Sequence, residues 1–398
     1  MRTLMLPELD LPGLPERLSR TRVLIVRHGQ STFNVQHKYQ GCSDDPVLTD
    51  SGVTAVALAG QHLLTERIDA IISSPLRRAR QTADIITDIL RQSGHDKPHL
   101  NINDDLIEVD LPQWQGLTHE AVRQQFPESH HIWCEQPDEL QMLRTDGSTF
   151  YPVRELFTQA NRFWRAFLRC HAGQAVALVT HGGTGRALIS TAIGVKPKRF
   201  HFIQQSNCGL SILEFPVGAT TAQIEALNLT AHLGERMPKL KLGRRGTRIV
   251  MVAGDSCWHP AHVSAMLSDL HVDFVLSTDD GPSQKMAHAL IEVHPHAERG
   301  IFRGDGWFDG RHNGTMPLVG SIALSRHSLS TGVIVGKHSD LDATLSKVLG
   351  MEGTDSAWKD SRNTVLHYPE RSGTPTIQAF NVPFWRDSFE PVTTEAHL

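Results

Sequence analysis

Short apolar runs alternate with amphipathic segments along the first half of the chain. The runs stand at 23–26, 68–73 and 175–179. Continuous apolar runs of this length are typical of strands buried on both faces of a sheet. The segments that follow them predict helices over about 52–64, from 75 onward and over 184–193. Strands that alternate with helices in this way predict a parallel α/β sheet.

Capping residues mark the starts of two of these helices. Thr49 or Asp50 precedes the first, and a side-chain oxygen there can accept a free backbone N–H of the opening turn. Ser74 precedes the second, with Pro75 as its first helical residue, a position that tolerates the missing N–H of proline. We therefore expect both helices to begin directly after a strand or a short loop.

The apolar pattern restarts in the second half and repeats in the same order. Four pairs of segments match: 22–26 with 248–252, 68–74 with 272–278, 175–179 with 332–336, and 209–217 with 374–382. The offset, roughly 150–230 residues, is far longer than a solenoid repeat and indicates two tandem domains. The predicted fold is α/β, with two tandem three-layer α/β/α domains, each around a mostly parallel central sheet.

Proline and charge patterns set the predicted boundaries. Three prolines in the first 20 residues predict an extended N-terminal arm at 1–20. Glycine, proline and a run of Lys and Arg predict a solvated linker at 231–246. The remaining segments are a first domain at 21–230, a second at 247–387 and a tail at 388–398.

Composition narrows the classes of function. A chain of 398 residues is long enough for two or three domains, and a net charge of −4 argues against general nucleic-acid binding. No apolar run approaches the length of a membrane helix. Five scattered cysteines without a CxxC pair fit a reducing compartment, so we expect a cytoplasmic protein with no nucleic-acid or membrane partner.

Basic side chains follow all three strands of the first half. Arg27 and His28 follow the first, Arg78 lies just beyond the second, and His181 follows the third. The carboxyl ends of parallel strands meet at one edge of the sheet, where ligands bind. Arginine forks and helix N-termini suit phosphate oxygens, and an imidazole among them is a plausible nucleophile toward phosphorus. The 23 histidines invite a metal interpretation, but the arginines would repel a cation, so we expect no metal and no cofactor.

Longer motifs around these residues resemble the histidine phosphatase superfamily, also called phosphoglycerate-mutase-like. They are LIVRHGQSTFN (24–34), KYQGCSDDPVLTDSG (38–52), SSPLRRARQTA (73–83), LIEVDLPQWQGLT (106–118) and VTHGGTGRAL (179–188). The resemblance covers about 21–230. Two further segments, YPVRELF (151–157) and QQSNCGLSILEF (204–215), look most like the chloroplast 2-carboxyarabinitol-1-phosphate phosphatases.

The resemblance implies a role for each matching residue. His28 would attack the phosphoryl group, while Arg27, Arg78 and His181 hold its oxygens. Glu108 would protonate the leaving group and then activate water. Further positions that line the pocket in relatives correspond to Asn34, Gln40 and Gly41. Many relatives carry a Phe-Gly pair shortly after this Glu, where this chain has 111–114 as LPQW, so Glu120 stands as the fallback acid.

The second half lacks this constellation when the two halves are aligned. Ala253 and Gly254 stand opposite Arg27 and His28, Pro282 opposite Arg78, and Lys337 opposite His181. We therefore expect a degenerate copy without phosphohistidine chemistry. Four polar residues could line a remnant pocket there: Asp255, Asp279, Asp280 and Lys337.

The implied function is a metal-independent phosphatase that hydrolyses a small phosphorylated metabolite. The expected substrate class is a sugar-acid phosphate such as 2-carboxyarabinitol 1-phosphate. One alternative is a phosphoglycerate mutase, although 119–150 lacks the Arg-Arg and Pro-Pro pairs of mutases in this superfamily. The other is a regulatory protein that binds a phosphometabolite, with the second half as a regulatory or dimerising module. A homodimer is a further hypothesis.

Overall fold

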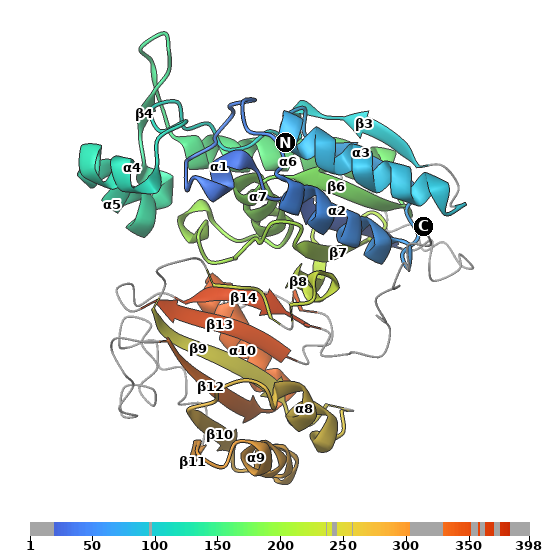
Figure 1. The fold of residues 1–398 in the computed structure, drawn as a ribbon, viewed down its shortest axis with the longest axis vertical. Helices are drawn as coiled ribbons and strands as arrows, with labels where there is room; N and C mark the ends of the chain where they lie inside the picture. Colours follow the sequence, from blue (N-terminus) through green and yellow to red (C-terminus); the bar gives the residue numbers. More distant parts are fainter. Residues whose placement is uncertain are drawn as a thin grey trace, which may run out of the picture.

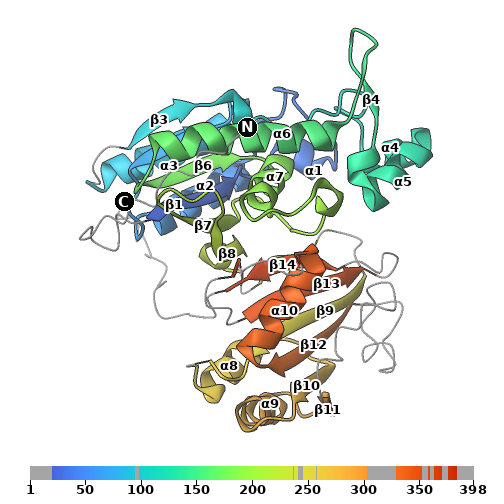
Figure 2. The same cartoon turned by 180° about the vertical axis from the view of Figure 1, so that it is seen from behind.

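The computed structural model describes residues 20–94, 98–235, 237–240, 245–256, 258–302, 329–351, 357–358, 363–369 and 375–382. We refer to the described residues up to 235 as the first half and to those from 237 onward as the second half. The predicted arm, apart from Arg20, and the predicted tail lie outside the described residues. Figures 1 and 2 show the two halves as α/β units stacked edge to edge.

Six strands form the sheet of the first half, in the order β3-β2-β6-β1-β7-β8. Their bounds are β1 (Arg20–Arg27), β2 (Ala70–Ser73), β3 (His99–Ile102), β6 (Ala175–Thr180), β7 (Leu210–Pro216) and β8 (Gln223–Leu229). The first four in chain order run parallel, β7 pairs antiparallel with β1, and β8 pairs antiparallel with β7. The carboxyl ends of β1, β2 and β6 therefore lie at one edge.

Helices cover both faces of this sheet. On one face, α2 (Asp50–Leu63) and α3 (Arg77–Gln92) pack against apolar side chains of β1 and β6. On the other lie α6 (Pro152–Cys170) and α7 (Gly182–Ala192). The α/β class with three layers is confirmed.

Smaller elements lie mainly in the loops beyond the carboxyl ends of the strands. They are α1 (Thr32–Val35), α4 (His119–Gln125), α5 (Pro127–Glu135), β4 (Met142–Leu143), β5 (Thr149–Phe150), and 3-10 turns at Asp104–Leu106, Pro137–Glu139, Pro197–Arg199 and Ala231–Leu233. In Figure 1, α4, α5 and β4 stand together at the side of the first half.

The two predicted N-caps have different outcomes. Thr49 caps α2, because its hydroxyl accepts the Gly52 amide at 3.0 Å. The prediction for α3 is wrong: the helix begins at Arg77 with Leu76 as N-cap, and Pro75 lies in the turn before it. The Ser74 hydroxyl lies 2.7 Å from His181 Nε2, so this side chain contacts a histidine instead of capping α3.

The second half has the same arrangement of strands, in the order β11-β10-β12-β9-β13-β14. Their bounds are β9 (Gly246–Ala253), β10 (Phe274–Thr278), β11 (Glu298–Phe302), β12 (Leu329–Gly336), β13 (Asn363–Pro369) and β14 (Thr376–Phe380). Again the first four strands in chain order run parallel, β13 pairs antiparallel with β9, and β14 pairs antiparallel with β13. Two helices, α8 (Pro260–Leu267) and α9 (Gly281–Val293), pack on one face, and α10 (His338–Leu349) packs on the other.

Strand pairing fixes which positions correspond. Arg22 pairs with Ala175 in the first half, as Arg248 pairs with Thr331 in the second. This agrees with the sequence match of β1 to β9, and the match of β2 to β10 also joins corresponding strands. The match of 209–217 with 374–382 joins strands that do not correspond, since the first segment lies on β7 and the second on β14. The counterpart of β7 is β13, which pairs with β9 as β7 pairs with β1.

The two halves meet at their antiparallel edges and share one sheet. β14 pairs with β8 at Phe380 and Leu227, which makes a continuous sheet of twelve strands. One apolar cluster also extends across both halves. The segment that joins the halves is not wholly solvated, because Pro238 is buried and Met237 packs against the second half.

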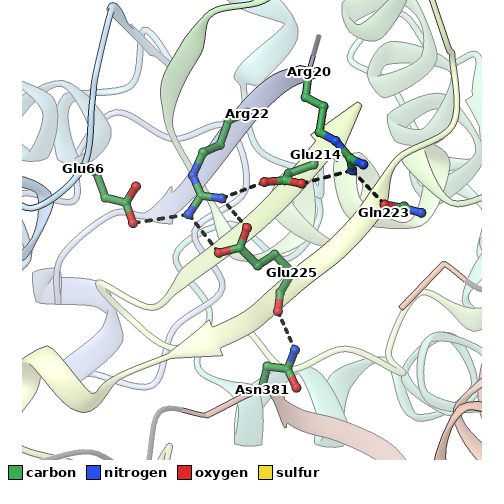
Figure 3. Close-up of polar contacts among 7 residues, drawn as sticks. All are labelled: Arg20, Arg22, Glu66, Glu214, Gln223, Glu225 and Asn381. Carbon is green, nitrogen blue, oxygen red and sulfur yellow. Dashed lines mark hydrogen bonds and ion pairs between the residues drawn. The ribbon is translucent and has the colours of Figure 1, made fainter. Parts of the chain in front are cut away.

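A charged cluster lies near the amino end of β1 (Figure 3). The Arg22 guanidinium contacts the carboxylates of Glu66, Glu214 and Glu225. Burial lowers the pKa of Arg22, but hydrogen bonds and charge from Glu225 and Glu66 outweigh it and raise the pKa overall. Arg22 lies at the opposite end of β1 from Arg27, so this cluster ties strands together away from the carboxyl edge.

Within the described part of the chain, no helix has the length and apolarity needed to cross a lipid bilayer.

Candidate active site

Four of the predicted residues meet at the carboxyl edge of the first sheet. The His28 and His181 rings lie 5.2 Å apart between centroids, at 60° to each other. His28, Arg78 and His181 are almost fully buried, at 2%, 0% and 0% exposure, and the pKa of His28 responds to the charges of Arg27 and Arg78. Residues up to 154 positions apart in the chain thus form one cluster because β1, β2 and β6 are parallel neighbours.

The geometry of His28 leaves one ring nitrogen free. Its Nδ1 lies 2.7 Å from the Gly29 carbonyl oxygen, which can only accept a hydrogen bond. Nδ1 therefore carries the proton, and Nε2 keeps its lone pair. Burial, together with the charges of Arg78 and Arg27, lowers the pKa of His28 well below 6.5. The imidazole is neutral at physiological pH, the state that a nucleophile requires.

The two arginines each present an unused donor. Arg78 donates to the Ser43 and Gly41 carbonyls at 2.7 and 2.9 Å, and Arg27 donates to the Gln205 carbonyl at 2.7 Å. The Nε atom of each is buried without a hydrogen-bond partner. Burial lowers the pKa of Arg78 to about 10, so the side chain remains cationic at neutral pH. Buried donors of this kind need an acceptor, and anionic oxygens between them would supply it.

His181 stands at the first position before α7. Its Nε2 lies 2.7 Å from the Ser74 hydroxyl, while its Nδ1 is buried and has no hydrogen-bond partner. Burial and the nearby charges of Arg78, His28 and Arg27 lower the pKa of His181 well below 6.5. The sequence analysis treated Ser74 only as a helix cap. A hydroxyl directly after the second strand, at the edge where ligands bind, was the signal for its second contact.

Glu108 reaches this cluster from the loop after β3. Its carboxylate accepts the amides of Gly183 and Thr184, both at 3.0 Å, at the start of α7. A Cβ on Gly183 would lie 2.4 Å from Glu108 Oε1, so only glycine permits this approach. The fallback acid Glu120 lies exposed on α4, paired with Arg123. Of the two carboxylates, Glu108 is the one beside His181.

The three expected pocket residues shape the loop around the cluster. Asn34 Oδ1 accepts the Ser31 amide at 3.0 Å, and Gln40 Oε1 accepts the Ser31 hydroxyl at 2.9 Å. Gly41 has φ +50° and offers its carbonyl to Arg78. Their contact with a ligand stays a prediction.

The sequence analysis missed Asn207 as a site residue. Its Nδ2 donates to the His28 carbonyl at 2.9 Å and lies 3.2 Å from Asn34 Oδ1. It falls within the 204–215 segment that was noted only for its resemblance to relatives. An amide side chain just before a strand that pairs with β1 was the available signal.

At the corresponding edge of the second half, Ser283 occupies the space beside the position that corresponds to His28. Gly254 donates its amide to Gly336 at 2.8 Å, as His28 does to Thr180 at 2.8 Å, which confirms that the two positions correspond. A Cβ on Gly254 would lie 2.6 Å from the Cα and Oγ of Ser283. No side chain fits at the nucleophile's position without moving α9.

The acids expected in a remnant pocket there bind helices instead. Asp280 accepts the Ser283 amide at 3.0 Å and caps α9, and Asp255 accepts the His338 amide at 2.9 Å at the start of α10. Asp279 accepts the Gln284 side chain at 2.8 Å, and Lys337 is exposed. These carboxylates occupy the helix N-termini that would otherwise favour a phosphate.

Histidines elsewhere in the described residues do not gather into a metal site. Across the described ranges, no three His, Cys, Asp or Glu side chains stand close enough to share a metal ion.

Comparison with known proteins finds several relatives of the first half. The 2-carboxy-D-arabinitol-1-phosphatase of Triticum aestivum is 38% identical over 204 residues, 51% of this chain and 39% of that protein. Phosphoserine phosphatase 1 of Hydrogenobacter thermophilus is 28% identical over 216 residues, 54% of this chain and 95% of that protein. Phosphoserine phosphatase from Entamoeba histolytica, solved in complex with 3-phosphoglyceric acid, aligns with TM-score 0.45 and 22% identity over 54% of this chain and 99% of its own.

The chain spans only about two fifths of the length of the plant relative. A family model covers most of the first half. The model described as Histidine phosphatase superfamily (branch 1) matches residues 23–229, the range that contains Arg27, His28, Arg78, Glu108 and His181. The chain belongs to the histidine phosphatase superfamily.

Proposed function

We propose that the first half hydrolyses a small phosphorylated metabolite through a phosphohistidine on His28. One observation carries the proposal: His28, a neutral, buried imidazole with its lone pair on Nε2, lies in a cluster where the Nε–H groups of Arg27 and Arg78 are buried without partners. A phosphoryl group bound there would place its oxygens against the two guanidinium groups. Charge that shifts among the oxygens during transfer is then stabilised by groups already in position.

The proposed reaction has two steps. His28 Nε2 attacks phosphorus, the bond from phosphorus to the substrate oxygen breaks, and the Glu108 carboxyl gives its proton to that oxygen. In the second step Glu108, now a carboxylate, takes a proton from water, and the water oxygen attacks phosphorus. The phosphorus–nitrogen bond breaks, its electron pair returns to Nε2, and phosphate leaves. Glu108 suits this exchange because α7 holds its carboxylate beside His181.

A sugar-acid phosphate is our choice of substrate class. The support is the similarity to the wheat 2-carboxy-D-arabinitol-1-phosphatase and the resemblance of 151–157 and 204–215 to such enzymes. Hydrolysis is favoured over a mutase reaction because 119–150 lacks the paired arginines and paired prolines of mutases in this superfamily. The active enzyme is expected to need no metal.

We further propose that the second half is a copy of the first that has lost its chemistry. The support is the common strand order, together with Gly254, Pro282 and Lys337 at the positions of His28, Arg78 and His181. Contact between Gly254 and Ser283 leaves no room for a nucleophile. The second half would therefore fold on the same plan without turning over a phosphoester.

A substrate panel tests the proposal on the full chain. Phosphate release is measured from sugar phosphates, phosphoserine, phosphoglycerates and 2-carboxyarabinitol 1-phosphate, with and without EDTA. We expect the fastest release from the sugar-acid phosphate, unchanged by EDTA, and a phosphoenzyme that is labile in acid and stable in alkali. Interconversion of 2- and 3-phosphoglycerate without phosphate release would overturn hydrolysis. Binding without any turnover would overturn catalysis altogether.

A further inference from the structure

One short segment of the first half lies between the candidate active site and the second half. It comprises Phe202–Asn207, which leads into β7, and it is largely buried, with Gln204 and Gln205 at 4% and 2% exposure. Its hydrogen bonds go in two directions, and together they connect β14 with the residues around His28.

Towards the second half, the segment pairs with β14. Ile203 forms a parallel bridge with Ile377. The Ile377 amide donates to the Phe202 carbonyl at 2.6 Å, and the Gln204 amide donates to the Ile377 carbonyl at 2.8 Å. The Gln204 side chain also donates to the Lys239 carbonyl at 3.0 Å, in the segment that connects the halves. The main chain of the second half therefore fixes one side of the segment.

Towards the active site, the same segment holds two of the reacting groups. The Gln205 carbonyl accepts Arg27 Nη1 at 2.7 Å and so sets the direction of that guanidinium. Asn207 Nδ2 donates to the His28 carbonyl at 2.9 Å. A displacement of the segment would move the guanidinium and the nucleophile's backbone together.

A single buried side chain bridges the two contacts. Asn228 Oδ1 accepts the Ser206 amide at 2.7 Å, and its Nδ2 donates to the Gln378 carbonyl on β14 at 2.7 Å. Asn228 is 0% exposed and adopts φ +53°, a conformation in which asparagine and glycine are common. Its amide thus links the segment at the active site to the second half.

The second half holds a matching asparagine directly after β14. Asn381 has φ +49°, and its Nδ2 donates to the Glu225 carbonyl on β8 at 2.9 Å (Figure 3). Asn228 binds the carbonyl of Gln378 and Asn381 binds the carbonyl of Glu225, on either side of the pairing between Leu227 and Phe380. This reciprocity is that of an isologous interface. The two asparagines therefore form a matched pair, and one of them contacts the segment beside the active site.

We infer that the second half is a positioning element of the active site, acting through Phe202–Asn207, with Asn228 as the positioning residue that connects them. The inference rests on the proposed function, because it concerns the groups that would hold the phosphoryl oxygens. Positioning of this kind affects the transition state most, and misplacement of about 1 Å can cost roughly 10²-fold in rate. A half without chemistry of its own would then still be required for full turnover.

The matched variants Asn228→Gly and Asn381→Gly test the inference in the full chain. Glycine accepts both backbone conformations, and each substitution removes a hydrogen bond between the halves. We expect kcat to fall about 10- to 100-fold in Asn228→Gly with KM within about threefold, while Asn381→Gly stays within about twofold of wild type. Both are assayed well below their thermal midpoints. Equal kcat values in the two variants would overturn the inference.

A second variant and a readout without turnover separate the possible causes. Asn228→Asp keeps an oxygen that accepts the Ser206 amide, but it replaces the N–H group that donates to the Gln378 carbonyl. A fall in kcat in Asn228→Asp would therefore come from loss of the hydrogen bond between the halves. Hydrogen–deuterium exchange of peptides that span 202–209 should be faster in Asn228→Gly than in Asn381→Gly. Unchanged exchange would overturn the inference even if wild type released no phosphate, a result that by itself would count only against the proposed function.

Discussion

The two halves of this chain share a scaffold and differ at one edge of it. Each has four parallel strands and two antiparallel ones in the same order, with helices on both faces. At the carboxyl edge, the first half gathers His28, Arg78 and His181, whereas the second has Gly254, Pro282 and Lys337. The comparison teaches that packing maintains the fold, while the chemistry depends on a few side chains at the strand ends.

The two edges also differ in the hydrogen-bond partners at their helix N-termini. In the first half, α7 receives the Glu108 carboxylate, and the nearby arginine Nε and His181 Nδ1 groups remain without partners. In the second, Asp280 and Asp255 satisfy α9 and α10, and Ser283 fills the space beside Gly254. Unpaired arginine N–H groups thus distinguish the edge that we propose binds an anion from the edge where carboxylates already accept the helix amides.

Removing the nucleophile should give the largest difference between the halves. We expect His28→Ala to lower kcat by at least about 10⁴-fold, since loss of a covalent nucleophile removes the whole two-step route. Lys337→Ala, at the exposed position that corresponds to His181, should leave kcat within about twofold. Phosphate release under saturating substrate measures both. Comparable losses in the two variants would mean that the second half takes part in the reaction.

Arg78 tests whether geometry, beyond charge, supports the first half. Arg78→Lys keeps the cation but loses the planar fork that reaches the Gly41 and Ser43 carbonyls. We expect kcat to fall about 10²- to 10³-fold, as for loss of one preorganised donor. The neighbouring exposed Arg77 provides the control, and Arg77→Lys should behave as wild type. A lysine at 78 with full activity would show that charge alone is sufficient.

Glu108 should show its role through the leaving group. Glu108→Gln removes the transferable proton, so we expect kcat for an alkyl phosphate to fall about 10²-fold or more. An aryl phosphate such as p-nitrophenyl phosphate has a better leaving group and should lose much less in the first step. Glu120→Gln, at the exposed alternative on α4, should change neither rate. A loss confined to Glu120→Gln would reverse the assignment.

Much of this organisation could be predicted from the sequence, and the exceptions have physical reasons. Apolar runs located β1, β2 and β6, because strands buried on both faces leave an unambiguous pattern. The same signal misassigned the partner of β7, since alternating antiparallel strands such as β13 and β14 look alike. Contacts made by main-chain atoms leave little trace in a sequence, so the pairing of Ile203 with Ile377 was not predictable. Ser74 and Asn207 were missed because their partners lie far away in the chain.

The pH profile tests whether the arginines keep His28 neutral. Burial and the charges of Arg78 and Arg27 lower its pKa below 6.5, so the decline of kcat/KM on the acid side should occur at pH values below that. Arg78→Gln removes one cation, so the pKa should rise and the acid limb should move to higher pH. Stability follows the same sign: the unfolded chain binds the proton first as pH falls below 6.5, so the free energy of unfolding decreases there. An acid limb that does not move in Arg78→Gln would contradict this electrostatic account.

The smallest expected effect concerns a contact that the halves share. Asp69 Oδ2 accepts the Ala175 amide at 2.8 Å, and Asp273 Oδ2 accepts the Thr331 amide at 2.7 Å, at corresponding ends of the two sheets. Even the second partners correspond, since Arg67 pairs with Asp69 and His271 pairs with Asp273. These outer pairs are partly exposed and add little, so the buried amide determines the cost.

We therefore expect Asp69→Ala and Asp273→Ala to reduce the free energy of unfolding by similar amounts, about 1–2 kcal/mol each, without changing kcat. Urea titration followed by circular dichroism measures the cost. Because one sheet and one apolar cluster extend across both halves, both variants should shift a single cooperative transition. Two transitions, each moved by only one variant, would show that the halves unfold independently. The second half would then be too loosely coupled to hold the segment at Phe202–Asn207 in place.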